Sequence, residues 1–163
     1  MTASAGSRPH PAAGTTPAGG STPGALVRGY VPGVFDLFHI GHLNILELAR
    51  QHCDWLVAGV VTDEKALRAK GKLPVIPLEE RVAILQHVTL VDEVVIEHQP
   101  SKLDVWREHP FDVIFKGDDW RGTAKGDQLE RDFAPVGVEV VYFPYTIHTS
   151  STLLRATLEG FAS

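Results

Sequence analysis

Residues 33–42 read Gly-Val-Phe-Asp-Leu-Phe-His-Ile-Gly-His, a turn that separates a short apolar run from an amphipathic segment. The run before it, Leu26 to Val31, predicts a strand, and Gly41 to His52 predicts a helix because apolar residues recur every third position. A strand, a glycine-containing turn and a helix start together favour anion binding. His39 and His42, placed at that helix start, would donate hydrogen bonds to a phosphate without adding a permanent charge.

The same alternation of apolar runs and amphipathic segments continues along the chain. Strands are predicted at Trp55–Val61, Glu93–Ile96, Asp112–Phe115 and Val138–Phe143, with helices beginning at Thr62, Pro77, Ser101 and Ser150 or Ser151. This alternation predicts an α/β fold: an open, doubly wound, Rossmann-like sheet, mainly of five parallel strands, with helices on both faces. Ligands of such folds bind at the carboxyl ends of the strands, so the loops after Val31, Phe115 and Phe143 form the candidate site.

Composition and charge limit the possible functions. The chain of 163 residues is 44% hydrophobic and 21% charged, as expected for one globular domain, and its net charge of −5 argues against nucleic-acid binding. Residues 1–25, rich in Ala, Gly, Pro, Ser and Thr, are expected to form a disordered tail, which leaves residues 26–163 as the domain. No stretch approaches the roughly 20 apolar residues that a membrane span needs. The single cysteine, Cys53, favours a reducing, cytoplasmic setting.

Each of the polar motifs also has a simpler explanation. The two histidines would be ordinary polar residues of a helix cap, whereas zinc binding is disfavoured because neither a cysteine nor a third histidine lies at matching spacing. Lys70 and Lys72, in a turn-rich stretch, would be solvated residues of a loop. The adjacent carboxylates of Asp118 and Asp119 would suit a metal pair or acid–base chemistry.

Together, however, the motifs resemble those of the nucleotidylyltransferase superfamily. The HxGH element that ends at His42 is followed by Val91-Asp92-Glu93-Val94, Gly117-Asp118-Asp119-Trp120 and Ser150-Ser151-Thr152, in that order. Over roughly Leu26 to Leu158 the chain is most similar to the cytidylyltransferase branch, and within it to the glycerol-3-phosphate cytidylyltransferases. The resemblance implies transfer of CMP from CTP to a small phosphorylated alcohol or phosphonate, with release of pyrophosphate. It also implies a Mg²⁺ ion carried with the triphosphate and a homodimer.

The resemblance assigns roles to the matching residues. The catalytic residues would be His39, His42, Lys70 and Lys72, with the histidines contacting the triphosphate and the lysines holding phosphate oxygens. The nucleotide would be bound by Gly33, Val34, Phe35, Gly41, Gly117, Asp119, Trp120, Ser150, Ser151 and Thr152. The acceptor would be bound by Lys70, Arg81, Tyr145 and His148. No side chain is expected to ligate a metal directly.

Two positions depart from the glycerol-3-phosphate branch, which has arginines where this chain has Thr89 and Tyr145. Arginine makes bidentate contacts with phosphate that neither of these residues can make. We therefore expect an acceptor other than glycerol 3-phosphate, with Lys116 or His148 supplying part of the missing charge.

Three other functions stay open. An adenylyltransferase of the heptose-phosphate type would use ATP and a sugar phosphate, and such enzymes also have a Lys-Gly pair before the base-binding segment. A non-catalytic nucleotide-binding or regulatory module is the second. A dinucleotide-binding oxidoreductase is the third, and it is disfavoured because no glycine fingerprint follows the first strand.

Overall fold

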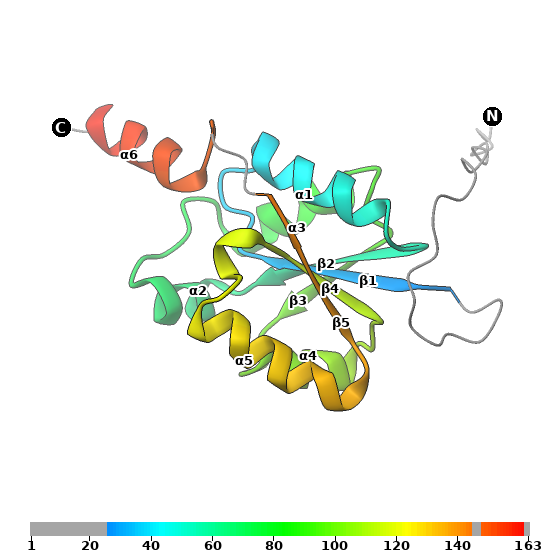
Figure 1. The fold of residues 1–163 in the computed structure, drawn as a ribbon. Coiled ribbons are helices and arrows are strands. Elements are labelled where there is room, and N and C mark those ends of the chain that lie inside the picture. Colours follow the sequence, from blue (N-terminus) through cyan, green and yellow to red (C-terminus); the bar gives the residue numbers. More distant parts are fainter. Residues whose placement is uncertain (1–25, 145–147, 162–163) are drawn as a thin grey trace, which may run out of the picture.

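The computed structural model describes residues 26–144 and 148–161. The predicted tail, residues 1–25, and the predicted acceptor residue Tyr145 lie outside these ranges. Five parallel strands form one sheet in the order β3-β2-β1-β4-β5, which confirms the predicted fold class (Figure 1). The strands are β1 Arg28–Gly33, β2 Trp55–Val61, β3 Glu93–Glu97, β4 Val113–Gly117 and β5 Glu139–Phe143. Each differs from its predicted range by at most two residues at either end.

The strand order places β1 at the centre of the sheet and creates a switch point beside it. The chain runs from β1 outward to β2 and β3, and then returns to the other side of β1 for β4 and β5. The connections after β1 and β4 therefore leave in opposite directions. A crevice opens between them at the carboxyl ends of the strands, where this class of fold binds its ligands.

Helices cover both faces of the sheet. They are α1 Ile40–Arg50, α2 Asp63–Lys70, α3 Leu78–Gln86, α4 Lys102–Glu108, α5 Ala124–Phe133 and α6 Ser151–Phe161. Leu46 of α1 and Leu85 of α3 belong to the core on one face, whereas Val105 of α4 and Phe133 of α5 belong to the core on the other. α6 projects away from the sheet and has no buried residue (Figure 1). No helix of the described residues is long and apolar enough to cross a membrane.

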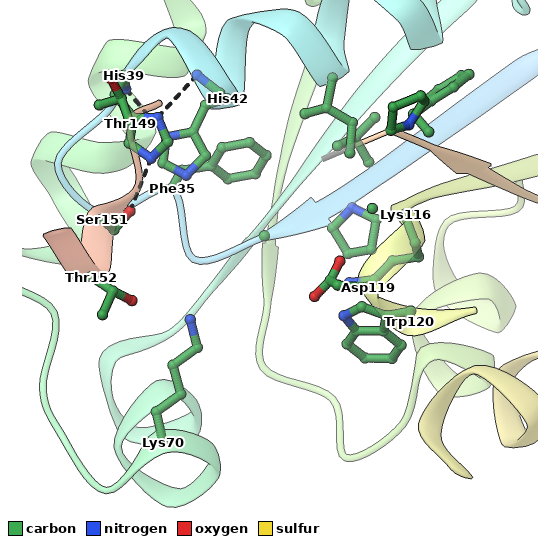
Figure 2. A pocket seen from close by; sticks show the side chains of 18 residues that line it. Phe35, His39, His42, Lys70, Lys116, Asp119, Trp120, Thr149, Ser151 and Thr152 are labelled. Atoms are coloured by element: carbon green, nitrogen blue, oxygen red, sulfur yellow. Dashed lines mark hydrogen bonds between the residues drawn. The ribbon is translucent and has the colours of Figure 1, made fainter. Parts of the chain in front are cut away.

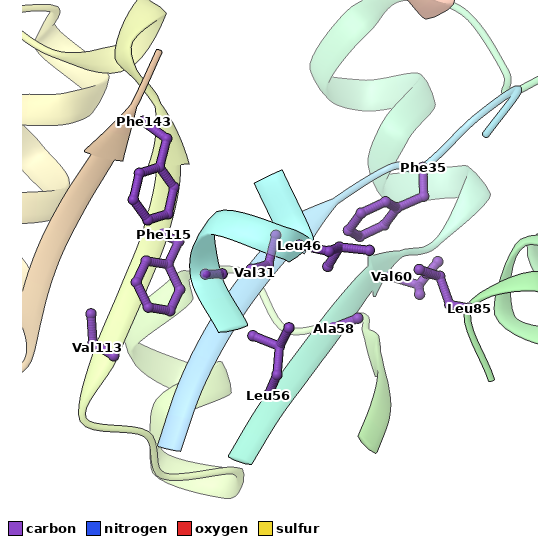
Figure 3. Packing of buried hydrophobic residues seen from close by; sticks show 11 residues of the cluster. Val31, Phe35, Leu46, Leu56, Ala58, Val60, Leu85, Val113, Phe115 and Phe143 are labelled. Carbon is purple, nitrogen blue, oxygen red and sulfur yellow. The ribbon is translucent and has the colours of Figure 1, made fainter. Parts of the chain in front are cut away.

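β2 lies inside the sheet, between β3 and β1, and its surroundings explain its uninterrupted apolar sequence. Leu56, Ala58 and Val60 face the cluster that includes α1 and α3 (Figure 3), and Val57 faces the cluster formed with α4 and α5. Both faces of β2 are therefore covered, so polar residues cannot alternate with apolar ones along it. The predicted range of this strand, Trp55–Val61, is confirmed at both ends.

One helix, α5, was not predicted from the sequence. Its signals are a capping residue, Thr123, whose Oγ1 accepts a hydrogen bond from the Gly126 N–H (3.2 Å), and an apolar pair one turn apart, Leu129 and Phe133. The remaining residues are mostly polar, and glycine weakens a helical pattern. Gly126 has a packing role, because a Cβ there would lie 2.1 Å from the carbonyl oxygen of Trp120.

A second close contact, at Gly59 in β2, gives a test of the packing. A Cβ on Gly59 would lie 1.9 Å from the hydroxyl oxygen of Tyr30, which donates a hydrogen bond to Glu97 Oε2 (2.8 Å). We expect Gly59→Ala to lower the free energy of unfolding by about 1–3 kcal/mol through overpacking. Combined with Tyr30→Phe, it should cost less than the sum of the two single substitutions, as chemical denaturation would show. The control is Gly160→Ala, whose added methyl group meets open space, and equal stability of the two alanine variants would contradict this packing.

Candidate active site

A cavity of about 260 Å³ opens at the carboxyl ends of β1, β4 and β5, at the switch point of the sheet. The starts of α1 and α6 and the end of α2 complete its wall (Figure 2). The predicted site residues that line it are Gly33, Phe35, His39, Gly41, His42, Lys70, Gly117, Asp119, Trp120, Ser151 and Thr152. Residues from the three loops identified in the sequence therefore meet in one cavity.

The histidine pair forms the cap of α1. His39 is the N-cap residue, and its Nδ1 accepts a hydrogen bond from the Gly41 N–H (3.0 Å). The Nδ1 atom of His42 accepts one from the His39 N–H (3.3 Å). Gly41 has no room for a side chain, because a Cβ there would lie 2.7 Å from Cε1 of the His39 ring. The helix-cap explanation is therefore correct for the two Nδ1 atoms, whereas the two Nε2 atoms take no part in the cap.

These contacts fix the tautomer of each neutral ring, since an imidazole whose Nδ1 accepts carries its proton on Nε2. The Nε2 atom of His39 lies 3.3 Å from the Ser151 hydroxyl, which donates to the Asp36 carbonyl (2.7 Å). Burial, together with the nearby His39 and Lys70, lowers the pKa of His42 to about 3. Burial also lowers the pKa of His39. At neutral pH the loop therefore presents uncharged N–H donors.

Asp36 holds the histidine loop in position. Its carboxylate accepts hydrogen bonds from the N–H groups of Val75 (3.0 Å) and Ile76 (2.9 Å) and from Nη2 of Arg155 (2.8 Å). Burial raises the pKa of Asp36, but these partners outweigh burial and hold the pKa below its usual value. Asp36 therefore stays ionised, and it connects the loop after β1 to α6 and to the segment that precedes α3.

The start of α6 supplies hydroxyl groups to the same cavity. Ser151 and Thr152 line it, and Ser151 also contacts His39 and the Asp36 carbonyl. Ser150 has a different role, since its Oγ accepts a hydrogen bond from the Leu153 N–H (3.2 Å) and caps the helix. Backbone N–H groups at a helix start favour a bound anion. The cavity is thus bordered by the starts of two helices, α1 and α6.

Of the predicted lysine pair, only Lys70 lines the cavity. It is the last residue of α2, which ends at Gly71 in a left-handed conformation (φ 69°). Figure 2 shows the Lys70 side chain extending from α2 toward the side of the cavity that holds the histidines. Lys72 lies beyond this turn and is exposed.

The opposite side of the cavity is formed by the segment after β4. Lys116, Asp119 and Trp120 gather there, across the cavity from Ser151 (Figure 2). The Lys116 Nζ atom lies 3.8 Å from the centre of the Trp120 ring, in a cation–π contact. Trp120 is fixed in turn by its backbone carbonyl, which accepts a hydrogen bond from the Thr123 hydroxyl (2.7 Å).

Arg81, which was predicted to bind the acceptor, has a structural role in this fold. The residue is 1% exposed. Its guanidinium donates to the carbonyls of Ile76 (3.0 Å), Val34 (2.5 Å) and Val61 (2.9 Å) and forms an ion pair with Asp63 (2.5 Å). Four of its N–H groups are therefore occupied, and the side chain joins the ends of β1 and β2 to α2 and α3. This corrects the expectation drawn from the family resemblance.

Four further predicted residues among those described do not line the cavity. They are Val34, Ser150, Lys72 and His148. Val34 contributes its carbonyl to Arg81 and Ser150 caps α6, so both support the site from outside. His148, predicted to contact the acceptor, is exposed. Tyr145 lies outside the described residues.

Sequence reasoning gave no role to Asp36 or Arg155 and only a replacement role to Lys116. A signal for Asp36 was present, because a carboxylate inside a predicted anion-binding loop needs internal donors to neutralise it. No comparable signal identifies its partner, since Arg155 lies 119 positions along the chain from Asp36.

The histidine geometry predicts an unusual titration. We expect histidine-selective NMR to find His42 neutral, with its proton on Nε2, until the pH falls to about 3. The unfolded chain binds this proton at its ordinary pKa of about 6.5, so this group makes the free energy of unfolding decrease as the pH falls from about 6.5 toward 3. A His42 midpoint near 6.5, or a proton on Nδ1, would contradict the hydrogen bonding described above.

Comparison with known proteins identifies the family of the chain. Residues 30–157 match the cytidylyltransferase-like family. The glycerol-3-phosphate cytidylyltransferase of Bacillus subtilis (strain 168) is 38% identical over 130 residues, which cover 78% of this chain and 94% of the relative. The FAD synthase of Pyrococcus horikoshii is 36% identical over 123 residues, which cover 73% of this chain and 81% of the relative.

A solved structure with the same fold is the lipopolysaccharide core biosynthesis protein of Thermoplasma volcanium GSS1. It matches with a TM-score of 0.64 at 25% identity, over 77% of this chain and 100% of that chain. The family match spans most of the chain and includes all eleven predicted residues found in the cavity wall. This chain therefore belongs to the cytidylyltransferase-like family of nucleotidyltransferases.

Proposed function

We propose that this protein transfers CMP from CTP to a small phosphorylated alcohol or phosphonate and releases pyrophosphate. The observation that carries the proposal is the arrangement of His39 and His42, whose protonated Nε2 atoms lie at the start of α1, beside the start of α6, in one cavity. Uncharged donors and two helix starts suit a highly charged triphosphate.

The reaction is a displacement at phosphorus. An oxygen of the acceptor forms a bond to the α-phosphorus of CTP while the bond to the β-phosphate oxygen breaks, and the electron pair of that bond leaves with pyrophosphate. A phosphate monoester or phosphonate is already ionised at neutral pH, so no protein base is needed. Positioning and charge stabilisation therefore supply most of the rate.

Each part of the cavity has a role in this proposal. His42 and His39 donate to the oxygens of the α-phosphate, and Ser151, Thr152 and the start of α6 hold the β- and γ-phosphates. Lys70, at the end of α2, bridges nucleotide and acceptor. The base lies against the segment Gly117–Trp120 at the other end of the cavity.

We also propose that Mg²⁺ enters with the triphosphate. Within residues 26–144 and 148–161, no three His, Cys, Asp or Glu side chains gather closely enough to hold a metal ion. Phosphate oxygens and water, which Mg²⁺ prefers, would supply its ligands. When bound, the ion would reduce the negative charge of the triphosphate, and this chain's own donors would orient the phosphates.

A homodimer is part of the same proposal. α6 has no buried residue and carries three exposed apolar side chains, Leu153 (55%), Leu158 (49%) and Phe161 (85%). A second copy of the chain would cover these side chains, which a monomer would leave in water. A molecular mass of one chain in sedimentation equilibrium would contradict this part of the proposal.

ATP is the one alternative to CTP as the nucleotide substrate. It is supported by the similarity to an FAD synthase, because FAD contains adenine. In this second candidate function the chain would use ATP. Release of pyrophosphate should be measured with CTP and with ATP, each against glycerol 3-phosphate, ethanolamine phosphate and 2-aminoethylphosphonate.

We expect turnover with CTP. Turnover with one of the other two acceptors should be faster than with glycerol 3-phosphate. Turnover with ATP alone would favour an adenylyltransferase. Equal or better turnover with glycerol 3-phosphate would contradict the choice of acceptor. No release of pyrophosphate with any pair would favour a non-catalytic nucleotide-binding module.

The role of His42 can be tested by substitution. We expect His42→Ala to lower kcat at least about a hundredfold, since one preorganised donor to the reacting group contributes about 3 kcal/mol. Loss of its capping bond should cost only about 1 kcal/mol of stability, so the variant should fold. His98→Ala, at an exposed position outside the cavity, is the matched control and should retain its turnover. Near-normal turnover of a folded His42→Ala protein would remove the central assignment.

A further inference from the structure

Lys116 is a cation in the cavity wall that the proposed function has not yet used. It lies near the end of β4, and its Nζ atom is 3.8 Å from the centre of the Trp120 ring. Among the described residues, the ion pairs of this region include Lys65 and Lys102 but not Lys116. An ammonium group held over an aromatic ring keeps its N–H donors available to a ligand.

A buried cluster behind Lys116 explains why, among the described residues, Lys116 forms no ion pair. Glu97, at the end of β3, is 0% exposed. One of its oxygens forms ion pairs with Lys65 (2.6 Å) and Lys102, and the other accepts from the Tyr30 hydroxyl (2.8 Å). Two lysines therefore already share the single carboxylate, and the cluster leaves an excess of positive charge behind the cavity.

The groups that face Lys116 act on it in opposite directions. Burial and then Lys102 lower its pKa, Glu97 and Asp119 raise it, and Lys70 lowers it further, with a net result of about 7. Lys116 is therefore only partly protonated near neutral pH. A dianionic ligand beside it would favour the charged form.

The direction of the reaction places the acceptor on this side of the cavity. In an in-line displacement the attacking oxygen and the leaving group lie on opposite sides of the phosphorus. If pyrophosphate leaves toward Ser151 and Thr152 at the start of α6, the acceptor approaches from the opposite end. Figure 2 shows Lys116 at that end, beside the segment assigned above to the base and across the cavity from the histidine pair.

We propose that Lys116 binds the anionic group of the acceptor and selects acceptors that carry a dianionic phosphate or phosphonate. This inference rests on the proposed function. It identifies a cation that would replace the two arginines that the glycerol-3-phosphate branch has where this chain has Thr89 and Tyr145. A compact ammonium group, unlike a guanidinium, does not demand a bidentate arrangement of the phosphate oxygens. Lys116 thus recognises the phosphorus group and leaves the rest of the acceptor to other contacts.

The test is two-substrate kinetics of Lys116→Met, with CTP and whichever of the three acceptors named above the unmodified protein uses best. The acceptor KM should rise about 10- to 100-fold, the range of one charge-assisted hydrogen bond, and the KM for CTP should rise less, since Lys116 acts on the base only through its contact with Trp120. Lys125→Met, an exposed position on α5, is the control and should change neither value.

A pH profile separates this role from a structural one. In the unmodified protein the acceptor KM should rise between pH 7 and 9, because Lys116 loses its charge in that range. In Lys116→Arg the acceptor KM should be independent of pH over the same range, since arginine stays charged. This variant also provides the test if Lys116→Met fails to fold.

Two negative outcomes are distinguishable. If the unmodified protein releases no pyrophosphate with any acceptor, the proposed function fails and this inference fails with it. If the unmodified protein turns over but the acceptor KM is unchanged in Lys116→Met, or the pH profile is unchanged in Lys116→Arg, only the role of Lys116 is overturned.

Discussion

The buried carboxylate of Asp36 is the constraint on which the site depends. It is 5% exposed and joins three segments that are distant in the sequence, through the N–H groups of Val75 and Ile76 and the guanidinium of Arg155. Its neighbours Phe35 (φ 54°) and Leu37 (φ 50°) have left-handed backbones, which cost about 1–3 kcal/mol each in residues other than glycine. The contacts of Asp36 offset this strain and hold the histidine rings over the start of α1.

The two ends of the cavity differ in charge as a result of this arrangement. At the α1 end, His39 and His42 are neutral because their Nδ1 atoms accept backbone hydrogen bonds and burial disfavours the imidazolium form. At the other end, Lys116 is held by the Trp120 ring in front of a buried cluster with excess positive charge. Uncharged donors near the triphosphate and a cation near the acceptor would bring two anions together without a dense group of lysines that repel one another.

Much of this structure could be predicted from local sequence, and the rest depends on contacts between distant segments. β2 was predicted at both ends because a strand covered on two faces is apolar throughout. The place of His39 and His42 at the start of α1 was predicted from the glycine turn before an amphipathic segment. α5 was missed because its apolar side, Leu129 and Phe133, is too short to indicate a helix. The burial of Arg81 was unpredictable in a different way, since an arginine beside a lysine loop has the same local pattern whether it meets a ligand or the carbonyls of two strand ends.

The most direct test of the account is a crystal structure of the protein with CTP and Mg²⁺. It should show an oxygen of the α-phosphate about 3 Å from Nε2 of His42, with the β- and γ-phosphates at the start of α6 and the cytosine beside Trp120. A nucleotide bound far from the histidine loop, with the cavity filled only by solvent, would contradict the assignment of the site and of the reaction.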